Sequence, residues 1–120
     1  RVYLWAGMVH PDAPDRQSVL DALAPMARFV RQHGYPPETI DILSGKHSGA
    51  AASGFSAAIL PFLRATQEST ALQEQRTRLQ ARPVRKNAYY EQALALFGMG
   101  WDDNFYQFTA SGQLQVRWQR

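Results

Sequence analysis

Five helical segments of two alternating kinds limit the possible folds of this 120-residue chain more than any other feature. Three of them are apolar on nearly all sides, which is typical of helices that are buried all round. The two between them carry charged and polar residues along one face, so we expect them at the surface. In chain order, the segments are residues 2–9 (buried), 15–33 (surface), 55–66 (buried), 69–82 (surface) and 87–101 (buried).

This order predicts two layers, with inner helices surrounded by outer ones, as in a helical ring or a solenoid. No sequence repeat of fixed period accompanies it, which disfavours a regular solenoid. Three inner helices cannot close a ring, so we expect the chain to be part of something larger. The opening RVYLWAGMVHP points the same way, because its apolar residues suit the interior of a buried helix better than a frayed terminus.

Prolines and glycines divide the helical segments. We expect segment 15–33 to kink or restart at Pro25 and to stop at Gly34, and segment 55–66 to kink at Pro61. Short polar residues before the helices are candidate N-caps. These candidates are Asp12 or Asp15, Ser56, Ser69 or Thr70, and Asn87.

Two stretches are not helical. The long connection over residues 34–54 includes a candidate short strand at Thr39–Leu43, and long loops of this kind often line functional sites. Residues 105–118 are typical of a β-hairpin with a turn at Ser111-Gly112. Leu114, Val116 and Trp118 alternate with polar residues there.

Composition excludes several classes of protein. Hydrophobic residues make up 45% and charged residues 19%, as in an ordinary globular domain. No apolar run reaches the ~18 residues of a membrane span, so we expect no membrane insertion. The chain has no cysteine, which excludes disulfides and thiolate chemistry within it. Its net charge of +3 is concentrated between Arg76 and Lys86, where the lack of interleaved aromatics favours a solvated outer helix over nucleic-acid binding.

No set of polar residues makes a convincing active site by itself. Asp102-Asp103 is interpreted as a solvated cap or turn. Glu91 either has a raised pKa in an apolar setting or lies at the helix margin, beside an arginine. Ser56 has no His or Asp at motif spacing that could activate its hydroxyl. The histidines lie in turns and a loop without the spacing of metal ligands: His10, His33 and His47.

Aromatic residues gather near the ends of the buried helices and in the long loop. Their flat faces could hold sugar rings, or they could be ordinary core. Spacing alone leaves both interpretations open. The residues are Tyr3, Trp5, Tyr35, Phe55, Tyr89, Tyr90 and Trp101.

Five ordered blocks resemble the C-terminal third of glycoside hydrolase family 8: RVYLWAGM, GYPPETIDILSGK, GFSAAILPFL, YYEQALALFGMGW and FTASGQLQVRW. The resemblance covers essentially the whole chain and is weakest at 69–86. It implies an all-α fold, part of an (α/α)6 barrel of alternating inner and outer helices, with a short C-terminal β-hairpin. Residues 1–120 would then be the C-terminal portion of a single catalytic domain whose N-terminal portion is missing here.

The resemblance also implies an activity. The family's endo-β-1,4-glucanases hydrolyse internal bonds of cellulose with inversion, using a Glu as general acid and an Asp as general base. The base stands in a D-x-x-R pattern whose Arg matches Arg1, so it would precede Arg1 by three residues, and the acid would lie further upstream. We therefore expect no catalytic residue in this segment, no metal and no cofactor, and no activity in the isolated chain.

Substrate-binding or base-supporting roles are implied for Arg1, Tyr3, Phe55, Ser56 and Tyr89. One helical turn after the base, Arg1 would favour its carboxylate form. Tyr3 would reach towards the cleft, and the other three lie at the starts of two inner helices, whose ends would face the groove.

The implied partners are a cellulose chain and the N-terminal part of the same domain, in a periplasmic or secreted enzyme. The alternative is a non-catalytic helical module that binds a glycan or uses its basic patch.

Overall fold

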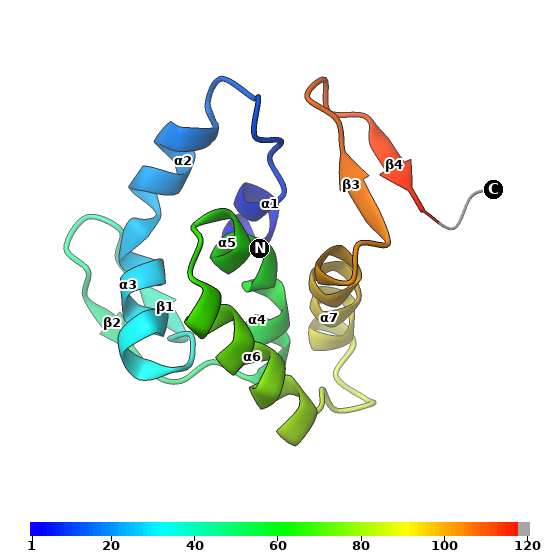
Figure 1. Ribbon diagram of the computed structural model, residues 1–120. Helices are drawn as coiled ribbons and strands as arrows, with labels where there is room; N and C mark the ends of the chain where they lie inside the picture. Colours follow the sequence, from blue (N-terminus) through cyan, green and yellow to red (C-terminus); the bar gives the residue numbers. More distant parts are fainter. Residues whose placement is uncertain (118–120) are drawn as a thin grey trace.

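The expected two layers of helices are present in the computed structural model, which describes residues 1–117 (Figure 1). Its helices are α1 (Val2–Gly7), α2 (Arg16–Ala22), α3 (Ala24–His33), α4 (Ser53–Ala58), α5 (Leu60–Ala65), α6 (Ser69–Ala81) and α7 (Tyr89–Asp102). Its strands are β1 (Thr39–Ile40), β2 (His47–Ser48), β3 (Tyr106–Phe108) and β4 (Leu114–Val116).

The apolar segments form the inner layer. The α4–α5 pair lies in the middle, where α5 packs on α1 and α4 packs on α7 (Figure 1). The polar-faced helices α2, α3 and α6 cover this layer from outside. The predicted alternation of inner and outer helices is therefore confirmed, and the architecture is that of part of an (α/α)6 barrel.

Both proline-containing segments divide into two helices. Pro25 lies in the first turn of α3, which begins just after the break at Leu23, and Pro61 occupies the same place in α5. A proline is tolerated there because the first helical N–H groups have no partner within the helix. The predicted stop at Gly34 is confirmed, since this residue caps α3 with a left-handed backbone, φ 77°.

The predicted N-caps are wrong. Asp15 does occupy the N-cap position of α2, but its side chain makes no capping hydrogen bond. Glu68 and Ala88 precede α6 and α7, one residue away from the predicted caps in each case. Because α4 begins at Ser53, Ser56 lies within the helix and cannot cap it. Packing of the apolar faces, not capping, decides where these helices begin.

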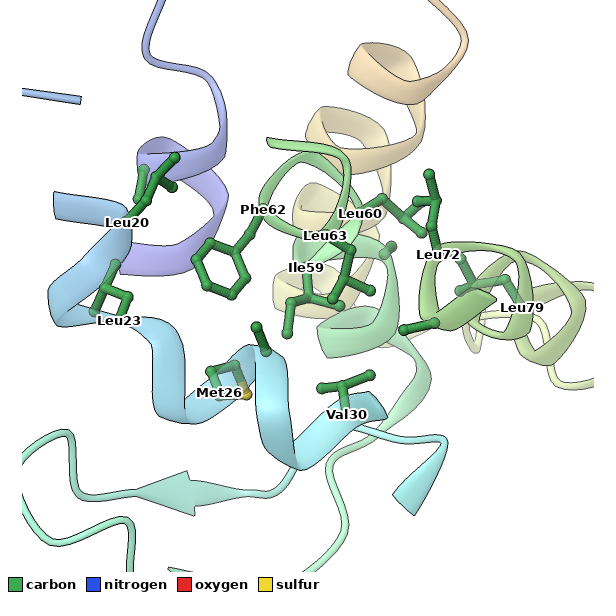
Figure 2. Packing of buried hydrophobic residues seen from close by; sticks show 14 of the residues in the cluster. Leu20, Leu23, Met26, Val30, Ile59, Leu60, Phe62, Leu63, Leu72 and Leu79 are labelled. Atoms are coloured by element: carbon green, nitrogen blue, oxygen red, sulfur yellow. The ribbon is translucent and has the colours of Figure 1, made fainter. Parts of the chain in front are cut away.

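The main core lies between the two layers (Figure 2). Its outer side comes from α2 and α3, which direct Leu20, Leu23, Met26 and Val30 inwards. These residues meet Ile59, Phe62 and Leu63 from the middle of the inner layer. On the far side α6 adds Leu72 and Leu79. A second, smaller cluster joins the three inner helices through Leu4, Met8, Ala58 and Leu94.

Two glycines set how closely the inner helices approach. A Cβ on Gly7 of α1 would overlap the backbone of Phe62 in α5. A Cβ on Gly98 of α7 would overlap the carbonyl oxygen of Ala57 in α4. Glycine is therefore required at both helix crossings, because the obstructing atoms are backbone and cannot rotate away.

The strands form two small antiparallel hairpins. The predicted strand Thr39–Leu43 is shorter than expected: only Thr39 and Ile40 pair, with Ser48 and His47. The side chain of Asp41 accepts hydrogen bonds from two backbone N–H groups and turns the chain instead.

The predicted C-terminal hairpin is confirmed as β3 pairing with β4, with Gly112 in its turn at φ 83°. Leu114 is exposed and Val116 is half-buried, while Trp118 lies outside the described residues. Among residues 1–117, none of the helices is both long and apolar enough to cross a membrane.

Candidate functional site

Two inner helices begin side by side and run in the same direction. Gly54 of α4 lies against Glu91 of α7, and a Cβ on Gly54 would come within 2.7 Å of the Glu91 Cβ. Further along, Ala57 meets Gly98, so both helices advance together. Their amino ends therefore form one edge of the inner layer.

Aromatic rings mark this shared edge. The ring of Phe55 lies edge-on to that of Tyr90, with 6.3 Å between the centroids. The neighbouring Tyr89 is 87% exposed, at the first position of α7. The structure thus brings Phe55 close to the start of α7, as expected for two residues of one groove wall.

Glu91 is the acidic residue at this edge. It lies in the first turn of α7, where the positive end of the helix dipole favours a carboxylate. Its side chain is half-buried over Gly54, and among residues 1–117 no arginine or lysine pairs with it.

Ser56 is fully buried behind the edge. Its hydroxyl has no hydrogen-bond partner among the described residues. Ser56 therefore does not face solvent in this chain, and its contribution to a site would be through packing.

The third inner helix is α1, and it runs parallel to the other two. Leu4 packs with Leu94, the rings of Trp5 and Phe97 lie 5.6 Å apart, and further along Gly7 lines a pocket together with Trp101. Thus α1 lies level with the second half of α7.

Arg1 and Tyr3 lie away from the aromatic edge. Arg1 is exposed at the N-cap of α1. Tyr3 packs edge-on against Phe62 at 5.2 Å, and burial raises the pKa of its phenol. Within the described part of the chain, no hydrogen bond or ring contact joins either residue to Phe55, Ser56 or Tyr89.

Asp102 is not the solvated residue that the sequence indicated. Its side chain is 9% exposed, and both of its oxygens accept hydrogen bonds from Arg76 of α6, at 2.7 and 2.8 Å. These hydrogen bonds raise the pKa of Arg76. The pair fastens the outer helix α6 to the end of the inner helix α7, and only Asp103 remains an exposed cap.

Arg78 also leaves the expected solvated face of α6. It donates a hydrogen bond to the carbonyl oxygen of Ala51 and lies over the ring of Tyr35, 5.6 Å from its centroid. Part of the predicted basic patch is therefore used to hold the long loop against α6. Nothing in the sequence spacing indicated either arginine contact, since the partners are at least 26 residues away.

The histidines have structural neighbours. His33 stacks on Phe29 at 4.0 Å, and His47 approaches the same ring edge-on at 4.4 Å. His10 accepts a hydrogen bond from the backbone N–H of Asp12. In the described chain, no three His, Asp or Glu side chains lie close enough together to hold a metal ion.

These features, a two-layered array of parallel inner helices with aromatic residues at their amino ends, agree with a match over most of the chain. The model of the glycosyl hydrolases family 8 matches residues 1–104. The chain belongs to this family.

The relatives are named endoglucanases. That of Escherichia coli (strain K12) is 42% identical over 118 residues, which are 98% of this chain and 31% of the relative. That of Xanthomonas axonopodis pv. citri (strain 306) is 41% identical over 121 residues, covering 98% of this chain and 32% of the relative.

A solved structure supports the same assignment. The endo-1,4-D-glucanase from Vibrio fischeri ES114 superposes with a TM-score of 0.75 at 30% identity, over 98% of this chain and 35% of that one. The chain thus spans about a third of the length of the relatives that it matches.

Proposed function

We propose that this chain is part of an endo-β-1,4-glucanase that cleaves internal bonds of cellulose with inversion. The observation that carries the proposal is the 42% identity, over nearly the whole chain, to a relative named an endoglucanase. Residues 1–120 would form the C-terminal portion of one catalytic domain. No cofactor is needed, because two carboxyl groups and a water suffice for the reaction.

The amino ends of α4 and α7 would form one wall of the substrate groove. Phe55 and the exposed Tyr89 offer apolar ring faces to the C–H faces of glucose units, and Glu91 offers a hydrogen-bond acceptor to their hydroxyls. Ser56 would support this wall from within. In this arrangement, the wall binds and orients the glucan but performs no proton transfer.

The general base would stand three residues before Arg1, and the general acid further upstream. Because α1 runs parallel to α7 with Trp5 beside Phe97, three residues before Arg1 is level with Tyr90. The base would therefore lie at the height of the aromatic edge, with Arg1 one turn below it. Inversion needs about 6.5–9.5 Å between the two carboxyl groups, so that a water fits between the base and the sugar.

The location of the enzyme follows from its substrate. Cellulose is an insoluble polymer outside the cytoplasm, so the enzyme would act in the periplasm or after secretion. Tyr3, which packs on Phe62, would help to fix the orientation of α1 and hence of Arg1.

The test is an assay of the parent enzyme on carboxymethylcellulose, with the anomeric form of the first product followed by NMR. We expect α-configured product from the β-linked chain, and a loss of at least tenfold in kcat/KM for Tyr89→Ala and Phe55→Ala. Leu43→Ala, at an equally exposed apolar residue of the β1–β2 turn, is the matched control and should keep full activity. The 120-residue chain alone should be inactive. Turnover by it, or β-configured product, would contradict the proposal, and glycan binding by an inactive parent would favour a non-catalytic module.

A further inference from the structure

Large apolar side chains are exposed on the two flanking inner helices. Val2 and Trp5 lie one turn apart on α1 and are 64% and 46% exposed. Leu96 and Phe97 on α7 are 73% and 42% exposed. Since the rings of Trp5 and Phe97 are in contact, these four residues make one continuous apolar surface, which we call the open face.

The open face lies where α7 has no helical neighbour. In α7, the residues that pack on α4 and α1 are Leu94, Ala95 and Gly98. Leu96 projects from the opposite side of the helix, two to four tenths of a turn from Phe97 and Ala93. Figure 1 shows α7 at the edge of the helical array, with α4 on one side and, among residues 1–117, no helix on the other.

An ordinary solvated surface does not explain this pattern. Scattered exposed apolar residues are normal, but a continuous surface with a tryptophan, a phenylalanine and a leucine indicates an interface. The middle of the inner layer shows what such a sequence requires: between α1 and α7, every residue from Ala57 to Leu63 is buried.

We propose that the open face is covered by another helical segment of the same catalytic domain, from the part of the parent enzyme outside these 120 residues. The relatives provide the length for it, since this chain spans only 31% of the Escherichia coli endoglucanase and 35% of the solved Vibrio fischeri structure. The occupant is apolar and packs on α7 as α4 does. The inference rests on the proposed function only in taking the chain as part of a larger enzyme.

The test uses chemical labelling, because the chain contains no cysteine and tolerates single reporters. Val2→Cys and Leu96→Cys are made in the parent enzyme, with Leu43→Cys as the matched control, since Leu43 is 95% exposed on the β1–β2 turn. Each variant is treated with a maleimide under native conditions and in urea, and the modified peptide is quantified by mass spectrometry.

We expect the cysteines at 2 and 96 to react at least 100-fold more slowly than the cysteine at 43 in the native enzyme, and at equal rates in urea. Equal rates in the native enzyme would overturn the proposal. Protection that disappears on dilution would assign the face to a second copy, and protection that requires added cello-oligosaccharide would assign it to the substrate; either result also overturns it.

A second measurement covers the case in which a cysteine variant folds poorly. Leu96→Glu should lower the Tm of the parent enzyme by several degrees, and Leu43→Glu should leave it unchanged. An equal Tm for both variants would contradict a buried Leu96. Neither readout depends on catalysis, so an inactive parent with a protected open face would refute the proposed function and leave this inference standing.

Discussion

The α4–α5 pair and helix α7 have similar apolar sequences but very different surroundings. From Ala57 to Leu63 every residue is buried, with Phe62 at 0% exposure. In α7, Leu94 is 3% exposed and Leu96, two residues later, is 73% exposed. The α4–α5 pair has inner helices on both sides, whereas within the described residues α7 has one on a single side.

This difference separates two meanings of an apolar helix. Its sequence records the surroundings of the helix in the whole domain, because apolar area removed from water stabilises the fold wherever the covering residues come from. The structure of a part shows which of those surroundings the part itself supplies. For α7, this chain supplies only one half.

The largest effect expected from the comparison is a difference between two phenylalanines. In the 120-residue chain, Phe62→Ala should cost about 3–5 kcal/mol of unfolding free energy, because it leaves a cavity between α1 and α3. Phe97→Ala should cost about 1 kcal/mol or less, since the ring is already partly in water. Urea unfolding followed by circular dichroism measures both. Similar costs would show that α7 is covered within the chain, and in the parent enzyme the cost of Phe97→Ala should rise.

A smaller effect is expected at the crossing of α4 and α7. Gly98→Ala should cost about 3 kcal/mol, because the new methyl group overlaps the carbonyl oxygen of Ala57 and the helices must move apart. Gly100→Ala on the same helix is the control: its Cβ would meet only a ring carbon of Tyr106, at 3.3 Å, and alanine favours the helix by about 1 kcal/mol. If the two substitutions had equal effects on urea unfolding, the close approach of α4 and α7 would be refuted.

The smallest effect concerns the end of α7 that β3 covers. The hydroxyl of Tyr106 donates a hydrogen bond to the carbonyl oxygen of Phe97, at 2.6 Å, and burial raises the pKa of Tyr106 to about 12. Folding therefore favours the neutral phenol, and this contribution to stability is complete below pH about 10 and is lost as the pH rises towards about 12.

Absorbance at 295 nm should show one tyrosine titrating late, and Tyr106→Phe should remove that step. The same variant should also flatten the loss of stability between pH about 10 and 12. A late step that persists in Tyr106→Phe would mean that another phenol, such as the half-buried Tyr3, is responsible.

Much of the fold could be predicted from local patterns. The contrast between residues 55–66 and 69–82 distinguished inner from outer helices, and Pro25, Pro61 and Gly34 marked real breaks. The helix starts could not be predicted from candidate caps. Ser69 and Ser56 lie inside α6 and α4, because helices held by packing do not need a side-chain cap.

The candidate site was predictable to a lesser degree. The placement of Phe55 and Tyr89 at the ends of inner helices followed from the resemblance, and their roles remain predictions. The proximity of Glu91 to Gly54 could not be foreseen, since it depends on the register between two helices 37 residues apart. Nor could the pairing of Arg76 with Asp102, which the sequence placed on a solvated helix and in a solvated turn.

The sequence by itself determined which helices are inner and which are outer, and the family to which the chain belongs. Periodicity and composition are local properties, and a chain keeps them whatever its length. Only the tertiary structure decided how closely the helices cross, which charges pair and which apolar face is left uncovered. Those properties depend on distances between residues far apart in the chain, where a single backbone atom or a missing neighbour changes the outcome.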